Sequence, residues 1–201
     1  MTSPPTSTPS AEGGRRAGRR RLAIGWGLGL LTSALAAAVA AALVVFGGVY
    51  DIRATSPHPE PMAWAIHEAM ANSVQLRSGE FTPPPSFSGR QVLAGFTVYD
   101  ADCVMCHGGP GVAREPWTSG MTPTPPFLLD VGRRFSAQDL RLIVGDGVKM
   151  TGMPAWRTVL TEEQLWDVVA FLKALPDLSA ADYRNMRAAA HARTGPRASQ
   201  G

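Results

Sequence analysis

Cys103 and Cys106 are the only two cysteines in the chain, and they lie three residues apart in the stretch DCVMCHGGPG. His107 follows the second cysteine directly. The chain has only four histidines in 201 residues, so this grouping would rarely arise by chance. Whatever fold surrounds these residues must therefore serve a role that needs two sulfurs and one imidazole together.

The spacing C-x-x-C-H is typical of covalent c-type haem attachment. Thiols at positions i and i+3 of a helix lie one turn apart on the same side, so each can reach one vinyl group of a porphyrin. The next residue, His107, can then direct its imidazole at the iron as the proximal ligand. We therefore expect one covalently attached haem c and its iron, held by Cys103 and Cys106.

Three other interpretations use the same residues. A thioredoxin-like dithiol needs a strand before the motif and a helix opening at it, but here a helix is predicted before the motif and a Gly/Pro loop after it. A structural zinc ion needs four ligands, and the adjacent Cys106 and His107 are poorly placed to bind the same ion. The remaining histidines lie outside the predicted domain, at His58, His67 and His191. A plain disulfide would close too small a loop to stabilise the fold much.

Residues 22–49 contain no charged side chain. As a helix, these 28 residues would span roughly 42 Å, more than the hydrocarbon core of a bilayer. The cationic stretch RRAGRRR precedes them, so the positive-inside rule places residues 51–201 outside the cytoplasm. A cleaved signal peptide is the main rival, but the apolar run is about twice the usual length of its apolar region, which is ~7–15 residues.

The positive charge of the chain is confined to its start. Residues 1–21 carry five arginines and one glutamate, whereas the other 180 residues carry 14 basic and 15 acidic groups. Nucleic-acid binding requires basic residues spread over a folded face, so this distribution argues against it. A small-molecule substrate is not expected either.

Composition and helix signals divide the chain into five segments. We expect a disordered basic N-terminus on the cytoplasmic side, a membrane helix, a linker containing a short amphipathic helix over 62–77, a haem domain, and a C-terminal helix with a loose tail. The respective ranges are 1–21, 22–50, 51–87, 88–178 and 179–201. In the linker helix, Met62, Ile66, Ala69 and Met70 mark the apolar face and leave His67 off it.

The predicted domain contains three main helices that begin at capping residues. Ser88 opens the first, Ser136 with Asp139 the second, and Thr161 with Gln164 the third. A long Gly/Pro-rich loop over 108–134 connects the first two. Three helices and long loops make a thin core, which favours a buried filler such as haem. The fold class is therefore all-α, with no strand pattern.

The far side of a haem iron needs a second ligand, and methionine suits electron transfer because it raises the reduction potential. Met121, Met150 and Met153 are the methionines within reach. Met153 precedes Pro154, which favours an extended backbone, and follows the flexible Gly152. We expect Met153 to be the ligand, with Met150 of the same loop as the main competitor.

The motifs CVMCHGGPG, GDGVKMTGMPAW and TEEQLWDVVAFLKALP together resemble class I cytochromes c, in particular membrane-anchored bacterial monohaem cytochromes. The resemblance covers about residues 62–186. It implies a fold in which the first and last helices of the domain cross closely, with Gly95 and Tyr99 facing Val168 and Phe171. It also implies that the Pro126 carbonyl accepts a hydrogen bond from His107. Leu128 is expected against the haem, and Trp156 beside it or packed in the core.

These features together predict a one-electron carrier on the outer face of the cytoplasmic membrane. Its partners would be a quinol-oxidising or dehydrogenase complex and a terminal oxidase, or it would be the cytochrome subunit of such a complex. The alternative is a haem peroxidase or gas sensor with a displaceable sixth ligand. A ring of lysines for docking is not evident, since residues 88–178 contain only Lys149 and Lys173.

Overall fold

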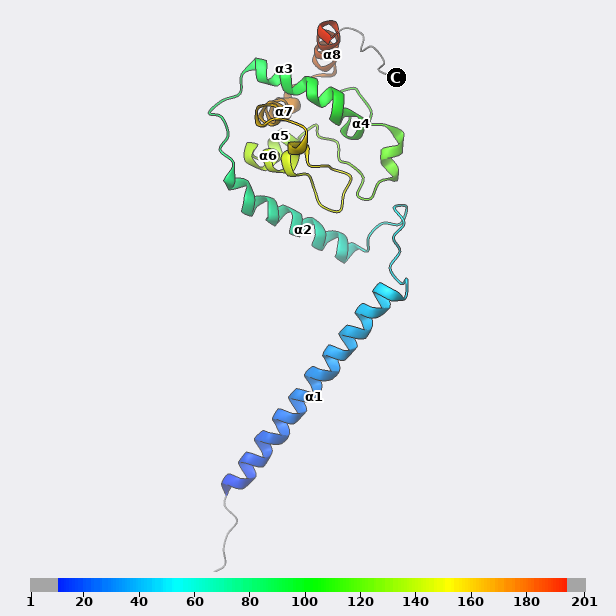
Figure 1. Ribbon diagram of the computed structural model, residues 1–201, viewed down its shortest axis with the longest axis vertical. Coiled ribbons are helices and arrows are strands. Elements are labelled where there is room, and N and C mark those ends of the chain that lie inside the picture. The colour runs from blue at the N-terminus through cyan, green and yellow to red at the C-terminus, as the bar shows by residue number, and fades with distance from the viewer. Residues whose placement is uncertain (1–10, 195–201) are drawn as a thin grey trace, which may run out of the picture. The chain divides into compact units, whose positions relative to one another are not determined.

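The computed structural model describes residues 11–194, and the chain divides into two compact units at Arg53 and Ala54 (Figure 1). The first unit holds a single long helix, α1 (Ala11–Phe46). The second unit consists of helices and loops, and among the described residues the only β-type pairing is an isolated bridge between Gly109 and Val112. The expected all-α fold is confirmed.

Helix α1 begins and ends earlier in the chain than the membrane helix predicted over residues 22–50. Residues 11–21, expected to be disordered, are helical, because alanine and arginine are good helix formers and extend the apolar helix backwards. Residues 1–10 lie outside the described part. The helix stops at Phe46 because Gly47 and Gly48 follow, and Gly48 adopts a φ of 64°. The span Gly18–Phe46 is long and apolar enough to cross a membrane.

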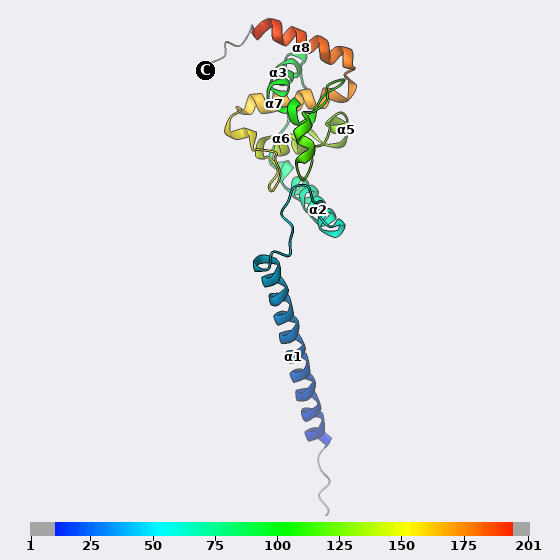
Figure 2. The same ribbon diagram turned by 90° about the vertical axis from the view of Figure 1, so that its right-hand side faces the viewer.

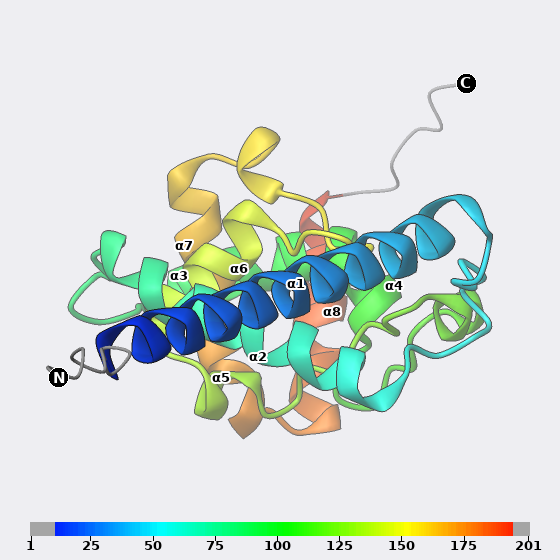
Figure 3. The ribbon, with the colours of Figure 1, turned by 90° about the horizontal axis from the view of Figure 1, so that it is seen from below.

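Over its described residues, 54–194, the second unit is built from seven α-helices joined by short helical turns. The α-helices are α2 (Glu60–Arg77), α3 (Gly89–Val98), α4 (Val104–His107), α5 (Val131–Arg134), α6 (Ala137–Asp146), α7 (Glu162–Ala174) and α8 (Ala180–Thr194). The turns are η1 (Ser78–Glu80), the π-helical η2 (Tyr99–Cys103), η3 (Pro116–Gly120), η4 (Trp156–Thr158) and η5 (Leu175–Asp177). The expected loop over 108–134 therefore contains η3 and α5, and Figure 3 shows the chain between α4 and α5 running along one side of the helices.

Helices α3, α6 and α7 start where their sequences predict. Ser88, Ser136 and Thr161 each accept a bond from the backbone N–H three residues later, and the side chain of that residue accepts from the N-cap N–H. Ser179 and Asp182 make the same reciprocal pair before α8. These boxes satisfy N–H groups that the first turn of a helix leaves without a partner, so the sequence alone sets the start of each helix.

Helices α3 and α7 cross at close contact in the middle of the second unit (Figure 1). Gly95 of α3 lies directly against the backbone of α7, where a Cβ built on it would overlap the Asp167 carbonyl oxygen. Beside the crossing, the rings of Tyr99 and Phe171 are 4.9 Å apart between centroids, and Val168 is fully buried. The close crossing implied by the resemblance is confirmed.

Replacing Gly95 by alanine is expected to destabilise the protein by about 2–4 kcal/mol, because the added methyl would have to push two helix backbones apart. Chemical unfolding of the purified full chain would measure the loss. Gly89→Ala is the matched control, because the same helix leaves open space around Gly89. Equal stability of the two variants would contradict the close crossing.

Helix α8 packs against the core of the domain through Tyr183. It lies over α3 (Figure 2), and the ring of Tyr183 is fully buried against Phe96, with 5.2 Å between the ring centroids. The same ring leaves no room for a side chain at Gly109, two residues after His107. Helix α8 therefore supports the backbone that follows the cysteine motif.

Helix α2, which was expected within a linker, belongs to the same compact unit and packs near α6 and η1. Its predicted apolar face is covered only in part. Met62 and Met70 of the predicted stripe are half-buried, Ile66 and Ala69 are exposed, and Val74, further along the helix, is buried. Coverage is partial because only some of the helix meets α6 and η1, and sequence periodicity does not indicate where that contact lies.

Candidate functional site

A cavity of about 430 Å³ lies inside the second unit, within the size range of about 300–1,000 Å³ typical of cofactor sites. Segments from α2 to α7 contribute to its wall, and most of the lining side chains are apolar. Every residue that the sequence placed at the haem lines it except Met150: Cys103, Cys106, His107, Pro126, Leu128, Met153 and Trp156. Residues spread over more than 50 positions of the chain thus meet around one space.

His107 is held in a defined orientation. Its ring Nδ1 lies 2.8 Å from the carbonyl oxygen of Pro126. A carbonyl can only accept, so Nδ1 carries the proton and the lone pair of the neutral ring is on Nε2. Burial lowers the pKa of His107, the hydrogen bond to Pro126 raises it by less, and the nearby charge of Arg114 lowers it further, so that the pKa lies below its usual value. The site thus favours a neutral imidazole at the cavity, the form that binds a metal ion.

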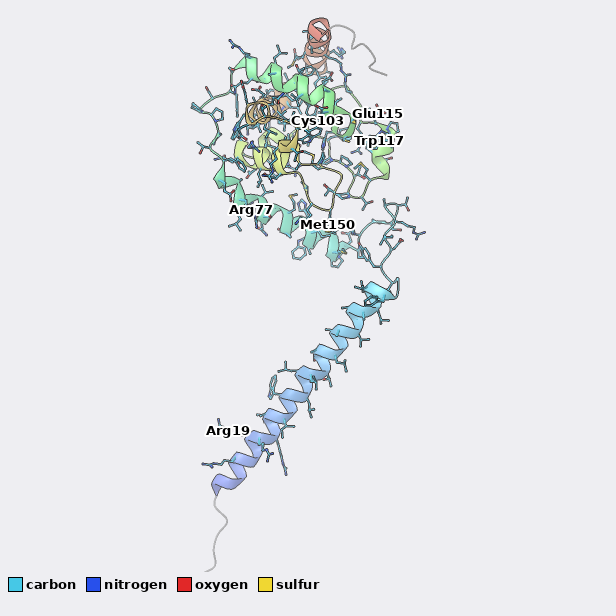
Figure 4. All side chains as sticks on the ribbon, viewed as in Figure 1. Arg19, Arg77, Cys103, Glu115, Trp117 and Met150 are labelled. Atoms are coloured by element: carbon cyan, nitrogen blue, oxygen red, sulfur yellow. The ribbon has the colours of Figure 1, made fainter. Side chains whose placement is uncertain are left out.

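The two cysteines lie where the π-helical η2 passes into α4. Both are free thiols and half-buried. Burial raises the pKa of Cys103 to about 12, with smaller effects from Asp102 and Cys106. A redox-active dithiol needs a thiolate with a lowered pKa, so this environment does not suit thiol–disulfide exchange. Figure 4 shows Cys103 within the helical unit.

The backbone after the motif turns sharply. Gly108 has a φ of 65°, and its carbonyl accepts a 2.7 Å hydrogen bond from the hydroxyl of Tyr99. Tyr99 is buried in the α3–α7 crossing, so the core itself fixes the end of α4. The described residues contain no group of three or more histidine, cysteine or acidic side chains that could hold a metal ion, which leaves the zinc interpretation without support.

The three candidate methionines differ in where they lie. Met153 and Met121 both line the cavity, and Met121 touches Gly152. Met150, the expected competitor of Met153, is 85% exposed and has a φ of 61° (Figure 4). Its position at the tip of a turn directs it to solvent, so Met121 takes its place as the geometric competitor.

The loop that carries Met153 is held by its own backbone. The Val148 N–H donates to the Met153 carbonyl at 3.2 Å, and the Met153 N–H donates to the Thr151 hydroxyl at 3.0 Å. Gly147, with a φ of 66°, packs directly against the Pro154 backbone. These contacts fix the chain on both sides of Met153.

Three residues at or beside the cavity were not predicted from the sequence. His67 and Met70 of α2 line the cavity, although His67 was placed off the apolar face of that helix and outside the domain. Arg114 contacts the loop that lines the cavity at Pro125 and Phe127. No motif marks these residues, because only the packing of α2 and the path of the loop bring them there.

A comparison with known families matches residues 90–172 to the family described as "Cytochrome C oxidase, cbb3-type, subunit III". This part of the chain is a monohaem c-type cytochrome domain. A cytochrome domain of this kind carries covalently bound haem c with its iron and transfers electrons. No curated protein and no solved structure shows significant similarity to the chain.

The residues around the cavity fit a haem. The cytochrome domain offers an apolar space bordered by two thiols, one imidazole and one thioether from Met153. The match ends at residue 172, before α8, and begins after α2. The two flanking helices therefore add contacts to the cytochrome domain that the family match does not include.

Proposed function

We propose that Cys103 and Cys106 hold the haem through thioether bonds and that His107 and Met153 bind its iron. One observation carries this proposal: a single apolar cavity is bordered by both thiols, by a neutral imidazole and by a thioether. His107 presents Nε2, because Nδ1 is engaged by Pro126. Met153 is brought to the same cavity by a loop that its own hydrogen bonds fix.

The surrounding residues have distinct tasks in this proposal. Pro126 orients the imidazole and increases its basicity through the Nδ1–H hydrogen bond. Leu128 and Trp156 contribute apolar cover to the cavity, and both also pack against the core. Excluding water in this way lowers the local polarity, which is one of the means by which a protein sets the potential of a bound haem.

The function that this arrangement supports best is one-electron transport at a membrane. The bound haem supplies the chemistry, cycling between ferric and ferrous iron. Two protein ligands leave no position for a substrate, so the domain acts as a carrier and not as an enzyme. Helix α1 anchors the chain, and the cationic residues before it place the domain outside the cytoplasm.

The partners we propose are membrane-bound electron donors and acceptors. The matched family is named for a subunit of a cytochrome c oxidase, which favours a terminal oxidase as acceptor or as the complex that the chain joins. A quinol-oxidising or dehydrogenase complex would be the donor. Anchoring keeps the domain at high effective concentration beside such partners.

Membranes that contain the haem-loaded full chain would test this function. A potentiometric titration is expected to give one reversible transition with n = 1, and an alkaline wash should leave the haem protein in the membrane. Replacing residues 1–50 by a cleavable signal peptide is expected to release it in soluble form on the extracytoplasmic side. The released domain should keep its potential, because α1 contributes no residue to the cavity. Haem protein that remains bound, or that titrates in more than one step, would contradict the proposal.

A further inference from the structure

The carbonyl that orients His107 belongs to a segment with little means of holding itself in place. Residues 123–127 have the sequence PTPPF and form no helix or strand. Three of the five residues are prolines, which have no backbone N–H to donate. The Pro126 carbonyl nevertheless has to stay 2.8 Å from His107 Nδ1. Apart from the bond that the Thr124 hydroxyl donates to the Met121 carbonyl, this segment therefore depends on a side chain from elsewhere.

Arg114 is that side chain. It lies seven residues after His107 and reaches both neighbours of Pro126. Its guanidinium donates to the Pro125 carbonyl, and its Cζ atom lies 4.5 Å from the centre of the Phe127 ring. A planar guanidinium can donate in its plane and stack on a ring with its face at the same time. Because residues 125 and 127 are both held, the Pro126 peptide between them cannot turn freely.

The Phe127 ring that Arg114 holds also contacts Gly108, the residue next to His107. A Cβ built on Gly108 would lie 3.0 Å from Cε1 of Phe127, so the ring held by Arg114 rests on the Gly108 backbone. Arg114, Phe127, Gly108 and His107 thus form a closed set of contacts around the Pro126 carbonyl. A change at Arg114 would therefore affect the His107 imidazole both through the Pro126 carbonyl and through the Gly108 backbone.

Arg114 also brings a positive charge to this side of the cavity. It is half-buried, and within the described residues no carboxylate lies at ion-pair distance from it. A fixed positive charge favours the uptake of an electron nearby.

We propose that Arg114 is a positioning residue that fixes the Pro126 carbonyl on His107 and whose charge favours reduction of the haem beside it. This inference rests on the proposed function, in which His107 binds the iron. The two effects are separable. Lysine at position 114 keeps the charge but lacks the planar fork, whereas methionine removes both and keeps the bulk.

The test compares Arg114→Lys and Arg114→Met in the haem-loaded full chain in detergent. Proton NMR would follow hydrogen exchange of the His107 Nδ1–H, which we expect to be at least about tenfold faster in both variants. In potentiometric titrations, the equilibrium constant for reduction of Arg114→Met should be about 3–10-fold below that of Arg114→Lys, where a tenfold change corresponds to 59 mV for one electron. Arg90→Met is the control, because it removes one positive charge at an exposed site.

Unchanged exchange in both variants would overturn the positioning role, and equal potentials of the two variants would overturn the role of the charge. Either result, with haem still bound and one-electron titration intact, would leave the proposed function standing. If His107 does not bind the iron in the unmutated protein, the proposed function itself is contradicted. Should Arg114→Met fail to accumulate, Arg114→Gln, which also removes the charge and the planar fork, replaces it in both comparisons. Equal potentials of Arg114→Gln and Arg114→Lys would overturn the role of the charge.

Discussion

Replacing both Cys103 and Cys106 by alanine is expected to reduce covalently bound haem to background. They are the only cysteines of the chain, and both line the cavity, so no other thiol can form a thioether. Haem staining of the denatured protein on a gel, with a pyridine haemochrome assay, would measure the loss. Each single variant should keep one thioether and shift the haemochrome band, because one vinyl group then remains unreacted.

The double variant should also lose its fold. Without haem, the mostly apolar wall of this cavity would lose its packing partner or be exposed to water, and either change lowers the free energy of unfolding. The native stability of a typical domain is only about 5–15 kcal/mol, so a loss of this kind can unfold it. We expect the haem-free chain to collapse or to be degraded, even though helix α1 still inserts.

Met105→Ala provides the matched control for the cysteine variants. Met105 lies between the two cysteines but is exposed and does not line the cavity. It should keep a full complement of haem. Covalent haem in the double cysteine variant, or its loss in Met105→Ala, would contradict the assignment of the attachment site.

Replacing Met153 by alanine is expected to leave the sixth position of the iron without a protein ligand. The near-infrared sulfur-to-iron charge-transfer band of the ferric protein should disappear. The ferrous protein should gain the ability to bind carbon monoxide. The reduction potential should fall, because thioether ligation is what raises it. Absorption spectroscopy with and without carbon monoxide would measure all three effects.

Two methionines of the same region give matched controls. Met150→Ala should change nothing, because that side chain is 85% exposed. Met121→Ala should keep the sulfur band with a small loss of stability, because Met121 lines the cavity beside Gly152 without being the proposed ligand. If the band disappears in Met121→Ala and survives in Met153→Ala, the ligand is Met121. Carbon monoxide binding by the unmutated ferrous protein would favour the gas sensor or peroxidase alternative.

Patterns formed by residues close together in the sequence were sufficient to predict much of the structure. The cysteine motif, the uncharged apolar segment and the capping pairs at Ser88, Ser136 and Thr161 each act through neighbours along the chain. Their outcome therefore depends little on the rest of the fold. The sequence alone thus predicted the all-α class, the starts of the helices and the haem cofactor, and all three are confirmed.

Only the tertiary structure decided which side chains meet at the cavity. The sequence favoured Met153 over Met150 because of Gly152 and Pro154, but only the fold shows that Met150 is exposed and that Met121 lines the cavity together with Met153. His67 and Arg114 approach the site from segments that no periodicity connects to it. Such contacts depend on how distant segments pack, and a linear pattern does not encode that packing. The sequence determined what the cavity must hold, and the packing determined which residues surround it.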